Sequence, residues 1–398
     1  MPARSLVPVL VLAALGAPVP AGAQKPRGFD AAWSGVHAAF DSTLREHRTV
    51  GGTLWFLQGD RVLAHANYGL ADAASGRAVT DSTIFHWASI TKTLTAIGIM
   101  QLRDRGKLSL DDPIVKYVPE LRQVHDSFGD IGEITLRQLM SHSAGFRNGT
   151  WPWSGDKAWY PFEPTKWSQL VAMMPYTEIL FRPGSRYGYS NPGIIYLGRV
   201  IERLTGDDYE VYVTKNILMP LGMQHSYFDV TPYHLLKDRS NGYEVADGKA
   251  TAVGLDFDTG ITTSNSGLNA PLTDMARYLA FLTGAPGHEA LYDGVLKRAS
   301  LEEMWRPVLP TGSTDEGDSV TAGFFSLHSG DRRYIGKTGS QAGYRSFFYV
   351  QPETRTAAIG VVNTSGSGPA DAGPDADAAW LLRDIRDRLM QRIFPLFH

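Results

Sequence analysis

The chain has 398 residues, with 38 basic and 41 acidic side chains and a formal net charge of −3. Hydrophobic residues make up 43% of it and charged residues 20%, a composition typical of globular proteins that argues against disorder and against a coiled coil. The balanced charge offers no basic footprint for nucleic acid. The chain contains no cysteine, which excludes disulfides, thiolate metal sites, iron–sulfur clusters and a cysteine nucleophile.

The first 23 residues have the pattern of a secretory signal peptide. Arg4 precedes an apolar run over residues 7–15, and small residues follow at 21–23, as in an A-x-A cleavage site. The alternative is a membrane anchor, but this run is too short to span a bilayer. We therefore predict cleavage before Gln24, a periplasmic or secreted mature chain, and no stable membrane span after cleavage.

The N-terminal part of the mature chain alternates between helix and strand patterns. Hydrophobic spacing predicts a helix over residues 29–47 and two strands over 52–57 and 61–67. A long helix is predicted from about residue 87 to residue 105, and Gly106 is a plausible stop after its last turn.

The second half of the chain begins with helical patterns and ends with strands. Residues 107 to about 310 carry short helical segments, many Gly and Pro breaks and few strand signals. A Gly/Ser/Pro-rich loop is predicted over 364–375, and an amphipathic helix over 382–393 closes the chain. Strand patterns before that loop cover residues 323–327, 332–337, 344–350 and 356–362.

Strands near both ends predict an α/β fold of the α+β type. We expect one antiparallel sheet, built from both chain termini and flanked by helices, with a mainly helical subdomain inserted at about 107–310. Together these parts form a single predicted domain over residues 24–398. The cleft between two such parts is a common place for a small-molecule site.

Because cysteine is absent, an activated hydroxyl is the first candidate nucleophile. Ser89 and Lys92 lie three residues apart at the start of the long helix, so they share a face and the ammonium reaches Ser89 Oγ. The N–H groups and dipole of a helix N-terminus also favour an oxyanion. The alternative is an ordinary serine at a helix start. A second S-x-x-K pattern at 154–157 lacks helical periodicity and is interpreted as chance.

Two further motifs follow, Tyr189-Ser-Asn191 and Lys337-Thr-Gly339. The order S-x-x-K, Y-x-N, K-T-G resembles that of serine β-lactamases and penicillin-binding proteins. A tyrosine in place of the serine of S-D-N makes the chain similar to class C β-lactamases, D-Ala-D-Ala carboxypeptidases and related esterases. Supporting segments extend the resemblance over nearly all of the mature chain, at residues 106–113, 134–145, 220–223 and 266–276.

This resemblance implies a serine β-lactamase/DD-peptidase-like fold and a serine hydrolase. Ser89 would attack a carbonyl carbon, and water would then release the acyl group. The backbone N–H groups of Ser89 and Ser340 would form the oxyanion hole. Tyr189 is one candidate general base, provided that the two ammonium groups of Lys92 and Lys337 lower its pKa from about 10 toward 7. The other candidate is a neutral Lys92, with Tyr189 as proton shuttle.

The resemblance also implies substrate-binding residues. Asn191 would bind a substrate amide carbonyl and orient Lys92, whereas Lys337 and Thr338 would bind a substrate carboxylate. Gly339 would leave its strand open to an extended substrate. The alternatives are a turn between helices for the Y-x-N motif and a strand end with a solvated lysine for K-T-G. No cofactor and no metal are expected, because the eleven histidines form no recognisable ligand cluster.

Two other features fall between the S-x-x-K and K-T-G motifs. His142 is predicted to have a structural hydrogen-bonding role. The segment that follows is rich in aromatic side chains, which either form an apolar rim over the cleft or pack a long loop against the helical subdomain. Its tryptophans are Trp151, Trp153, Trp159 and Trp167.

Three activities share such a site: β-lactamase, peptidase on D-amino-acid termini, and carboxylesterase. The K-T-G motif favours a substrate that bears a carboxylate, whereas the aromatic segment favours small hydrophobic esters. We predict an exported hydrolase that acts on a β-lactam or a D-amino-acid-terminated peptide, with a carboxylesterase as the alternative. A penicillin-binding sensor that is acylated without turnover is the alternative from another class. The expected partner is a small-molecule or peptide substrate, and the oligomeric state is left open.

Overall fold

The computed structural model describes residues 25–150, 164–246, 249–254, 259–366 and 378–398. The predicted signal peptide and the second S-x-x-K pattern at 154–157 lie outside these residues, as do Trp151, Trp153 and Trp159. Within the described ranges, no helix has both the length and the apolar character needed to cross a bilayer.

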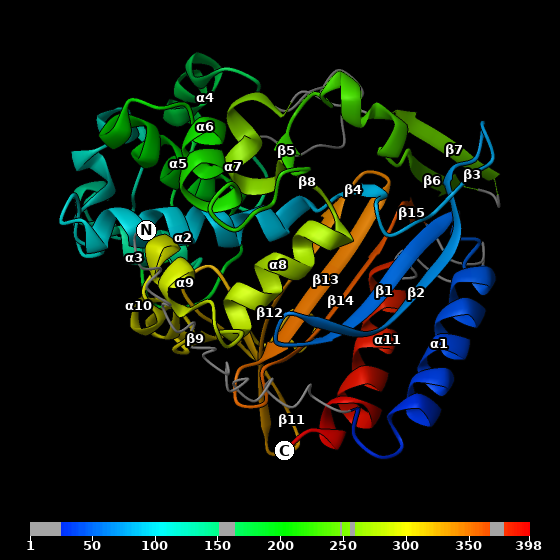
Figure 1. The fold of residues 1–398 in the computed structure, drawn as a ribbon. Coiled ribbons are helices and arrows are strands. Elements are labelled where there is room, and N and C mark those ends of the chain that lie inside the picture. The colour runs from blue at the N-terminus through cyan, green and yellow to red at the C-terminus, as the bar shows by residue number, and fades with distance from the viewer. Residues whose placement is uncertain (1–24, 151–163, 247–248, 255–258, 367–377) are drawn as a thin grey trace, which may run out of the picture.

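A nine-stranded antiparallel sheet is the largest element of the fold (Figure 1). Strands from the two ends of the chain meet inside it, because β1 pairs with β14 from Gly52 opposite Val362 to Gln58 opposite Thr356. This confirms the predicted sheet built from both termini. From one edge to the other, the strands are β3 (Arg77–Ala78), β2 (Arg61–Asp72), β1 (Gly51–Gln58), β14 (Thr356–Val362), β13 (Tyr344–Gln351), β12 (Arg332–Gln341), β11 (Phe325–Ser329), β10 (Ser319–Val320) and β9 (Leu309–Pro310).

Helices cover both faces of this sheet. Successive side chains of a strand point to opposite faces, and in β1 Leu54 and Phe56 belong to the core shared with α1 (Phe29–Glu46) and α11 (Ala378–Arg392). Trp55 and Leu57 belong to the other core, which contains α8 (Leu272–Thr283). Burial on both faces explains why β1 is apolar along most of its length rather than alternating.

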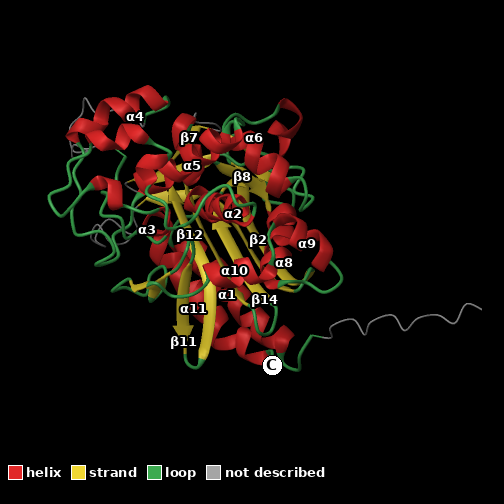
Figure 2. Ribbon diagram, turned by 90° about the vertical axis from the view of Figure 1, so that its left-hand side faces the viewer, coloured by secondary structure: helices red, strands yellow, loops and turns green. Residues whose placement is uncertain are grey.

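The helical part lies at one end of the sheet, around the central helix α2 (Thr91–Asp104), as Figures 1 and 2 both show. All residues of α2 from Thr91 to Leu102 are buried. Gly106 follows it with φ of 69°, the left-handed conformation typical of a residue after a helix. The other helices are α3 (Leu136–Met140), α4 (Trp167–Met173), α5 (Asn191–Thr205), α6 (Tyr209–Val213), α7 (Thr263–Ser266), α9 (Glu289–Val295) and α10 (Arg298–Met304).

Two small sheets were not indicated by the sequence. One has the order β4 (Ile84–His86), β8 (Leu268–Pro271), β5 (Tyr227–Phe228), and the other has the order β15 (Thr364–Gly366), β6 (Gly242–Ala246), β7 (Lys249–Gly254). Their strands have two to six residues, and a run of that length carries little periodic signal. β15 falls in the stretch predicted as loop, and β12 extends four residues beyond its predicted end at residue 337, to Gln341.

Candidate active site

Ser89 lies in a short turn that leads into the central helix. The turn is a 3₁₀ segment, Ala88–Ile90, placed directly before α2. Ala88 has φ of 48°, a left-handed conformation that is uncommon for a residue other than glycine. The preceding Trp87 is held on both sides, because its backbone N–H and its indole Nε1 donate to carbonyl groups of strand β8 at 2.8 and 2.9 Å. These hydrogen bonds hold the tightly bent turn that carries the partly exposed Ser89.

Two side chains converge on the Ser89 hydroxyl. Lys92 Nζ lies 2.9 Å from Ser89 Oγ, and the Tyr189 hydroxyl donates to the same oxygen at 2.9 Å. Lys92 Nζ also donates to the backbone carbonyl of Asn265, at 2.9 Å. The structure therefore brings together the serine, lysine and tyrosine of the first two motifs. Asn265 is a contact that sequence reasoning missed.

Burial moves the pKa values of the lysine and the tyrosine in opposite directions. It lowers the pKa of Lys92 well below its ordinary value, and the nearby ammonium of Lys337 adds to this effect. Burial raises the pKa of Tyr189 well above its ordinary value, and the carboxylate of Glu316 adds to that effect. Lys92 Nζ and Lys337 Nζ face the ring of Tyr189, at 5.1 and 4.8 Å from its centroid, while the Tyr189 hydroxyl binds Ser89. The arrangement favours a neutral amine beside a neutral phenol.

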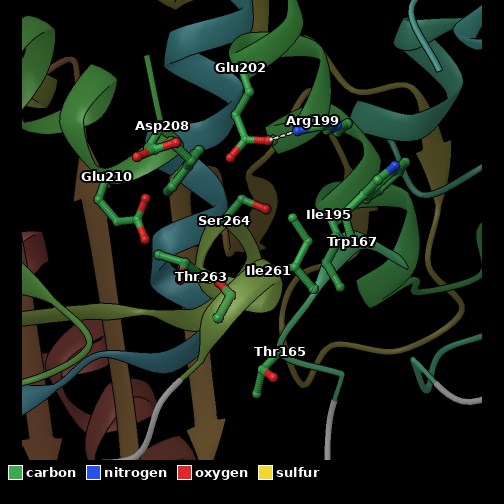
Figure 3. Close-up of a pocket in the computed structure, with 13 residues that line it drawn as sticks. Thr165, Trp167, Ile195, Arg199, Glu202, Asp208, Glu210, Ile261, Thr263 and Ser264 are labelled. Atoms are coloured by element: carbon green, nitrogen blue, oxygen red, sulfur yellow. Dashed lines mark hydrogen bonds and ion pairs between the residues drawn. The ribbon is translucent and has the colours of Figure 1, made fainter. Parts of the chain in front are cut away.

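The helix that supplies the Asn265 carbonyl is packed against α5. Figure 3 shows Ser264 of α7 and Glu202 of α5 facing one cavity of about 180 Å³. An ion pair of 2.7 Å joins Glu202 to Arg199 on the same helix. Trp167 lines this cavity and packs under the Arg199 guanidinium, 5.0 Å from its ring centroid. Trp167 is the one tryptophan of that aromatic segment that lies within the described residues, and it packs against the helical part.

His142 supports the ring of Tyr189. The two rings are stacked with centroids 4.5 Å apart and an interplanar angle of 26°, and His142 Nδ1 accepts a hydrogen bond from the backbone N–H of Ser190 at 3.2 Å. Burial lowers the pKa of His142 well below its ordinary value, and the positive charge of Lys337 lowers it further. The imidazole is therefore neutral, and these contacts agree with the structural role predicted for it.

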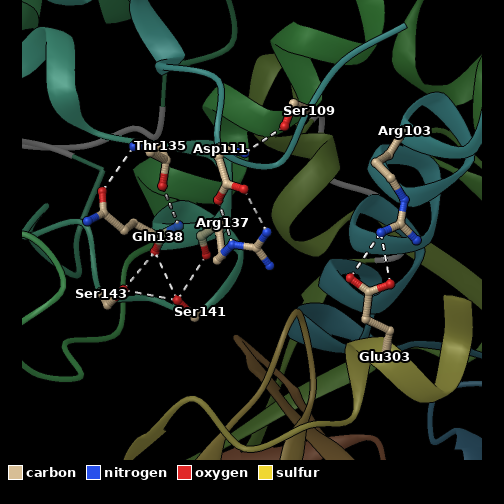
Figure 4. Close-up of polar contacts among 9 residues, drawn as sticks. All are labelled: Arg103, Ser109, Asp111, Thr135, Arg137, Gln138, Ser141, Ser143 and Glu303. Atoms are coloured by element: carbon tan, nitrogen blue, oxygen red, sulfur yellow. Dashed lines mark hydrogen bonds and ion pairs between the residues drawn. The ribbon is translucent and has the colours of Figure 1, made fainter. Parts of the chain in front are cut away.

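The turn that carries His142 is fixed by a network of serine, threonine and glutamine contacts (Figure 4). At the start of α3, the Thr135 backbone N–H donates to Gln138 Oε1 at 2.9 Å and the Gln138 N–H donates to Thr135 Oγ1 at 3.3 Å. Such a reciprocal pair caps a helix. After α3, Ser141 and Ser143 Oγ lie 3.0 Å apart, on either side of His142. His142 itself has φ of 51°, so this network holds a strained residue against Tyr189.

Asn191 is the first residue of α5, and its contacts differ from those expected. Its side chain donates to Asn148 Oδ1 at 3.3 Å and its backbone N–H donates to the Asn148 carbonyl at 3.1 Å. The hydrogen bonds of Lys92 go to Ser89 and to the Asn265 carbonyl instead. The structure therefore places Asn191 beside the site but assigns the orientation of Lys92 to α7.

The K-T-G residues lie on β12 beside the Ser89 turn. A Cβ built on Gly339 would come within 2.3 Å of the Trp87 carbonyl oxygen and 2.4 Å of Ser346 Oγ. Glycine is required here for the close approach of strand and turn, in addition to any role in substrate binding. Ser340 follows Gly339 at an exposed position of β12. Because Gly339 packs directly against Trp87, the backbone of Ser340 is adjacent to the segment that carries Ser89.

Lys337 and Thr338 both contact a glutamate that sequence reasoning missed. Thr338 Oγ1 donates to Glu316 Oε1 at 2.8 Å, and Lys337 Nζ lies 3.9 Å from the same oxygen. Lys337 is fully buried; burial lowers its pKa to about 8, against the opposing effect of Glu316. In the part of the chain that the structure describes, its Nζ has no hydrogen-bond partner. Glu316 lies between β9 and β10, outside every motif.

A family model described as beta-lactamase matches residues 36–381, a span that includes all three motifs. The chain belongs to the beta-lactamase family. This confirms the resemblance drawn from the order of the motifs.

Two curated relatives have names that indicate different activities. Esterase EstB of Burkholderia gladioli is 31% identical over 219 residues, which are 50% of this chain and 54% of the relative. A beta-lactamase of Pseudomonas fluorescens is 31% identical over 237 residues, which are 58% of this chain and 62% of the relative. The aligned part thus spans less than two thirds of each relative.

The fold is also that of a solved structure. An octameric penicillin-binding protein homologue from Pyrococcus abyssi superposes with a TM-score of 0.70 at 24% identity, over 83% of this chain and 73% of that one. At this identity the likeness shows the fold alone. It confirms the predicted serine β-lactamase/DD-peptidase-like fold.

Proposed function

We propose that this protein is an exported serine hydrolase that forms an acyl-enzyme on Ser89. The observation that carries the proposal is the pair of 2.9 Å contacts from Lys92 and Tyr189 to one serine oxygen. A serine becomes a nucleophile when an adjacent base accepts its proton. The opposite pKa shifts of the two neighbours favour a neutral Lys92 amine, which has a free lone pair to accept the Ser89 proton, and a protonated Tyr189, which has a proton to donate.

Acylation then follows from these positions. Neutral Lys92 accepts the Ser89 proton as Oγ attacks the substrate carbonyl carbon, and the backbone N–H groups of Ser89 and Ser340 stabilise the oxyanion. When the tetrahedral intermediate collapses, Tyr189 donates its proton to the leaving group and is reprotonated by Lys92. In the second half of the reaction, water attacks the acyl carbon with the proton transfers reversed.

The substrates proposed for this site are carboxylic esters, amides and β-lactams. Relatives named as an esterase and as a beta-lactamase support this range. All three classes present a carbonyl carbon whose tetrahedral intermediate needs the same oxyanion hole. Export rests on the signal-peptide pattern of residues 1–23.

Hydrolysis assays with three reporters test the proposal. We expect turnover of nitrocefin, p-nitrophenyl butyrate or a D-Ala-D-Ala peptide, and loss of at least about 10³-fold in Ser89→Ala, as expected for loss of a covalent nucleophile. Ser42→Ala on α1 is the control, because its Oγ donates to Glu46 of the same helix at 2.8 Å. Mass spectrometry separates a transient adduct on Ser89 from the persistent, stoichiometric adduct of a sensor. Absence of both turnover and adduct with all three reporters contradicts the proposal.

A further inference from the structure

The position that a substrate carboxylate would take on the K-T-G strand is held by a carboxylate of the chain itself. Glu316 Oε1 accepts the hydrogen bond of Thr338 at 2.8 Å and lies 3.9 Å from Lys337 Nζ. Its other oxygen accepts from the Tyr187 hydroxyl at 3.4 Å. The cation and hydroxyl of the motif therefore already face a negative charge.

The backbone around Glu316 is anchored, so this contact does not depend on the side chain alone. The guanidinium of the buried Arg386 donates to the carbonyl oxygens of Thr314 and Asp315 at 3.1 and 2.6 Å. The Tyr349 hydroxyl donates to the Glu316 carbonyl oxygen at 2.7 Å. Three consecutive carbonyl groups are thus tied to α11 and β13, two rigid elements of the fold.

We infer that Glu316 selects against substrates whose leaving group carries a carboxylate and directs the site toward neutral esters and amides. This inference rests on the hydrolase function proposed above and names its substrate class. With Glu316 paired to Lys337, the local charge is balanced, and a second carboxylate would either face Glu316 directly or have to displace it. Displacement would break the Thr338 hydrogen bond and separate the ion pair.

The space beside this pair is large enough for a leaving group. A cavity of about 370 Å³ is lined by Glu316, Thr338 and Ser340 together with residues of β13 and α11. Arg386 of α11 lines this cavity, and its guanidinium already donates to the backbone carbonyls of residues 314 and 315. A second arginine of this helix, Arg383, is paired with Asp315 at 2.5 Å. Both arginines of α11 that line the cavity are thus already engaged.

The test compares two aryl esters that differ only in the charge of the leaving group. 3-Carbamoylphenyl butyrate and 3-carboxyphenyl butyrate have the same acyl group, and the ratio of their kcat/KM values is measured in the wild type and in Glu316→Gln. We expect the preference for the neutral ester to fall by about tenfold or more, because a like charge at ~5 Å in a partly exposed site acts on that scale. Comparison of ratios cancels the intrinsic reactivity of the two esters.

Asp318→Asn is the matched control. It removes one negative charge from the same connection, and its carboxylate contacts the backbone N–H and the imidazole of His328, both at 2.8 Å, outside the residues that line the cavity. We expect its preference ratio to equal that of the wild type. Equal shifts in both variants would show a general charge effect and overturn the inference.

The remaining outcomes separate the two proposals. If the wild type hydrolyses both esters but Glu316→Gln leaves the ratio unchanged, the inference is wrong and the hydrolase function stands. If the wild type hydrolyses neither ester but turns over nitrocefin or the D-Ala-D-Ala peptide, the inference is wrong and the hydrolase function stands; if it gives neither turnover nor adduct with any of these compounds, both fall. If Glu316→Gln is inactive, the dissociation constants of the two leaving groups, 3-hydroxybenzoate and 3-hydroxybenzamide, replace kcat/KM; an unchanged ratio of these constants again overturns the inference.

Discussion

Gly339→Ala tests whether the Ser89 turn and β12 depend on their close approach. The added Cβ would lie 2.3 Å from the Trp87 carbonyl oxygen, whereas real Cβ contacts essentially never fall below 3.0 Å. The strand or the turn must therefore move apart by at least 3.0 − 2.3 = 0.7 Å. Both partners belong to fixed backbone, so the shift separates Ser89 from Ser340, the two residues assigned to the oxyanion hole.

Such a displacement has two expected effects. A misplacement of about 1 Å in a catalytic constellation costs on the order of 10²-fold in rate. Overpacking of a buried contact costs about 1–3 kcal/mol in the free energy of unfolding. We therefore expect kcat/KM for p-nitrophenyl butyrate to fall about 100-fold in Gly339→Ala, with a lower midpoint of denaturant unfolding.

Gly35→Ala is the matched control for the same substitution. Gly35 is exposed on α1, has no positive φ and has no atom within 4 Å of a built Cβ, so alanine there stabilises the helix by up to about 1 kcal/mol. We expect wild-type kcat/KM and a higher unfolding midpoint. Wild-type activity and stability in Gly339→Ala would refute the reasoning that this glycine sets the distance between strand and turn.

Two further variants test the electrostatics of the site. Tyr189→Phe should reduce kcat/KM for an unactivated alkyl ester by about 10²-fold or more. The kcat/KM for p-nitrophenyl butyrate should fall much less, because p-nitrophenolate leaves without a proton. Equal losses on both esters would instead make Tyr189 the general base. Lys337→Met should increase the free energy of unfolding at pH 7 by about 3 kcal/mol. The reason is that the pKa of Lys337 is about 8 in the folded state and about 10.4 in the unfolded state, and each unit of this difference destabilises the folded protein by about 1.4 kcal/mol. The wild type recovers this stability as pH rises from 8 to 10.5, so the difference, measured by denaturant unfolding, should vanish above that window. The same variant should move the acid limb of the kcat profile to higher pH, because the Lys337 ammonium lowers the pKa of Lys92; an unmoved limb contradicts this coupling.

Parts of the site that depend on short sequence spacing could be predicted. Ser89 and Lys92 are three residues apart at the start of a helix, and that spacing alone brings Nζ within 2.9 Å of Oγ. The antiparallel sheet could be predicted because its long strands near both termini carry strong β patterns. In both cases the local pattern and the tertiary structure agree.

Other contacts could not be predicted, for identifiable physical reasons. Lys92 is held by the carbonyl of Asn265, 173 residues away. Every residue has a backbone carbonyl, so residue type cannot indicate which one binds Lys92. Glu316 sits in a connection between two strands of two residues each, and its partners come from β12 and from Tyr187 ahead of α5. Only the assembled fold shows that its carboxylate, rather than that of any other acidic residue, reaches Thr338.

The packing of the helical part is itself part of the chemistry proposed for Ser89. Burial of α2 from Thr91 to Leu102 lowers the pKa of Lys92, and α2 stays buried because its polar side chains are satisfied there. Thr95 Oγ1 bonds the Tyr209 hydroxyl at 2.8 Å, and Thr93 Oγ1 accepts from Tyr278 at 2.7 Å. Opening this packing would admit water, raise the pKa of Lys92 and protonate the base. The stability of α2 and the reactivity of Ser89 therefore depend on the same contacts.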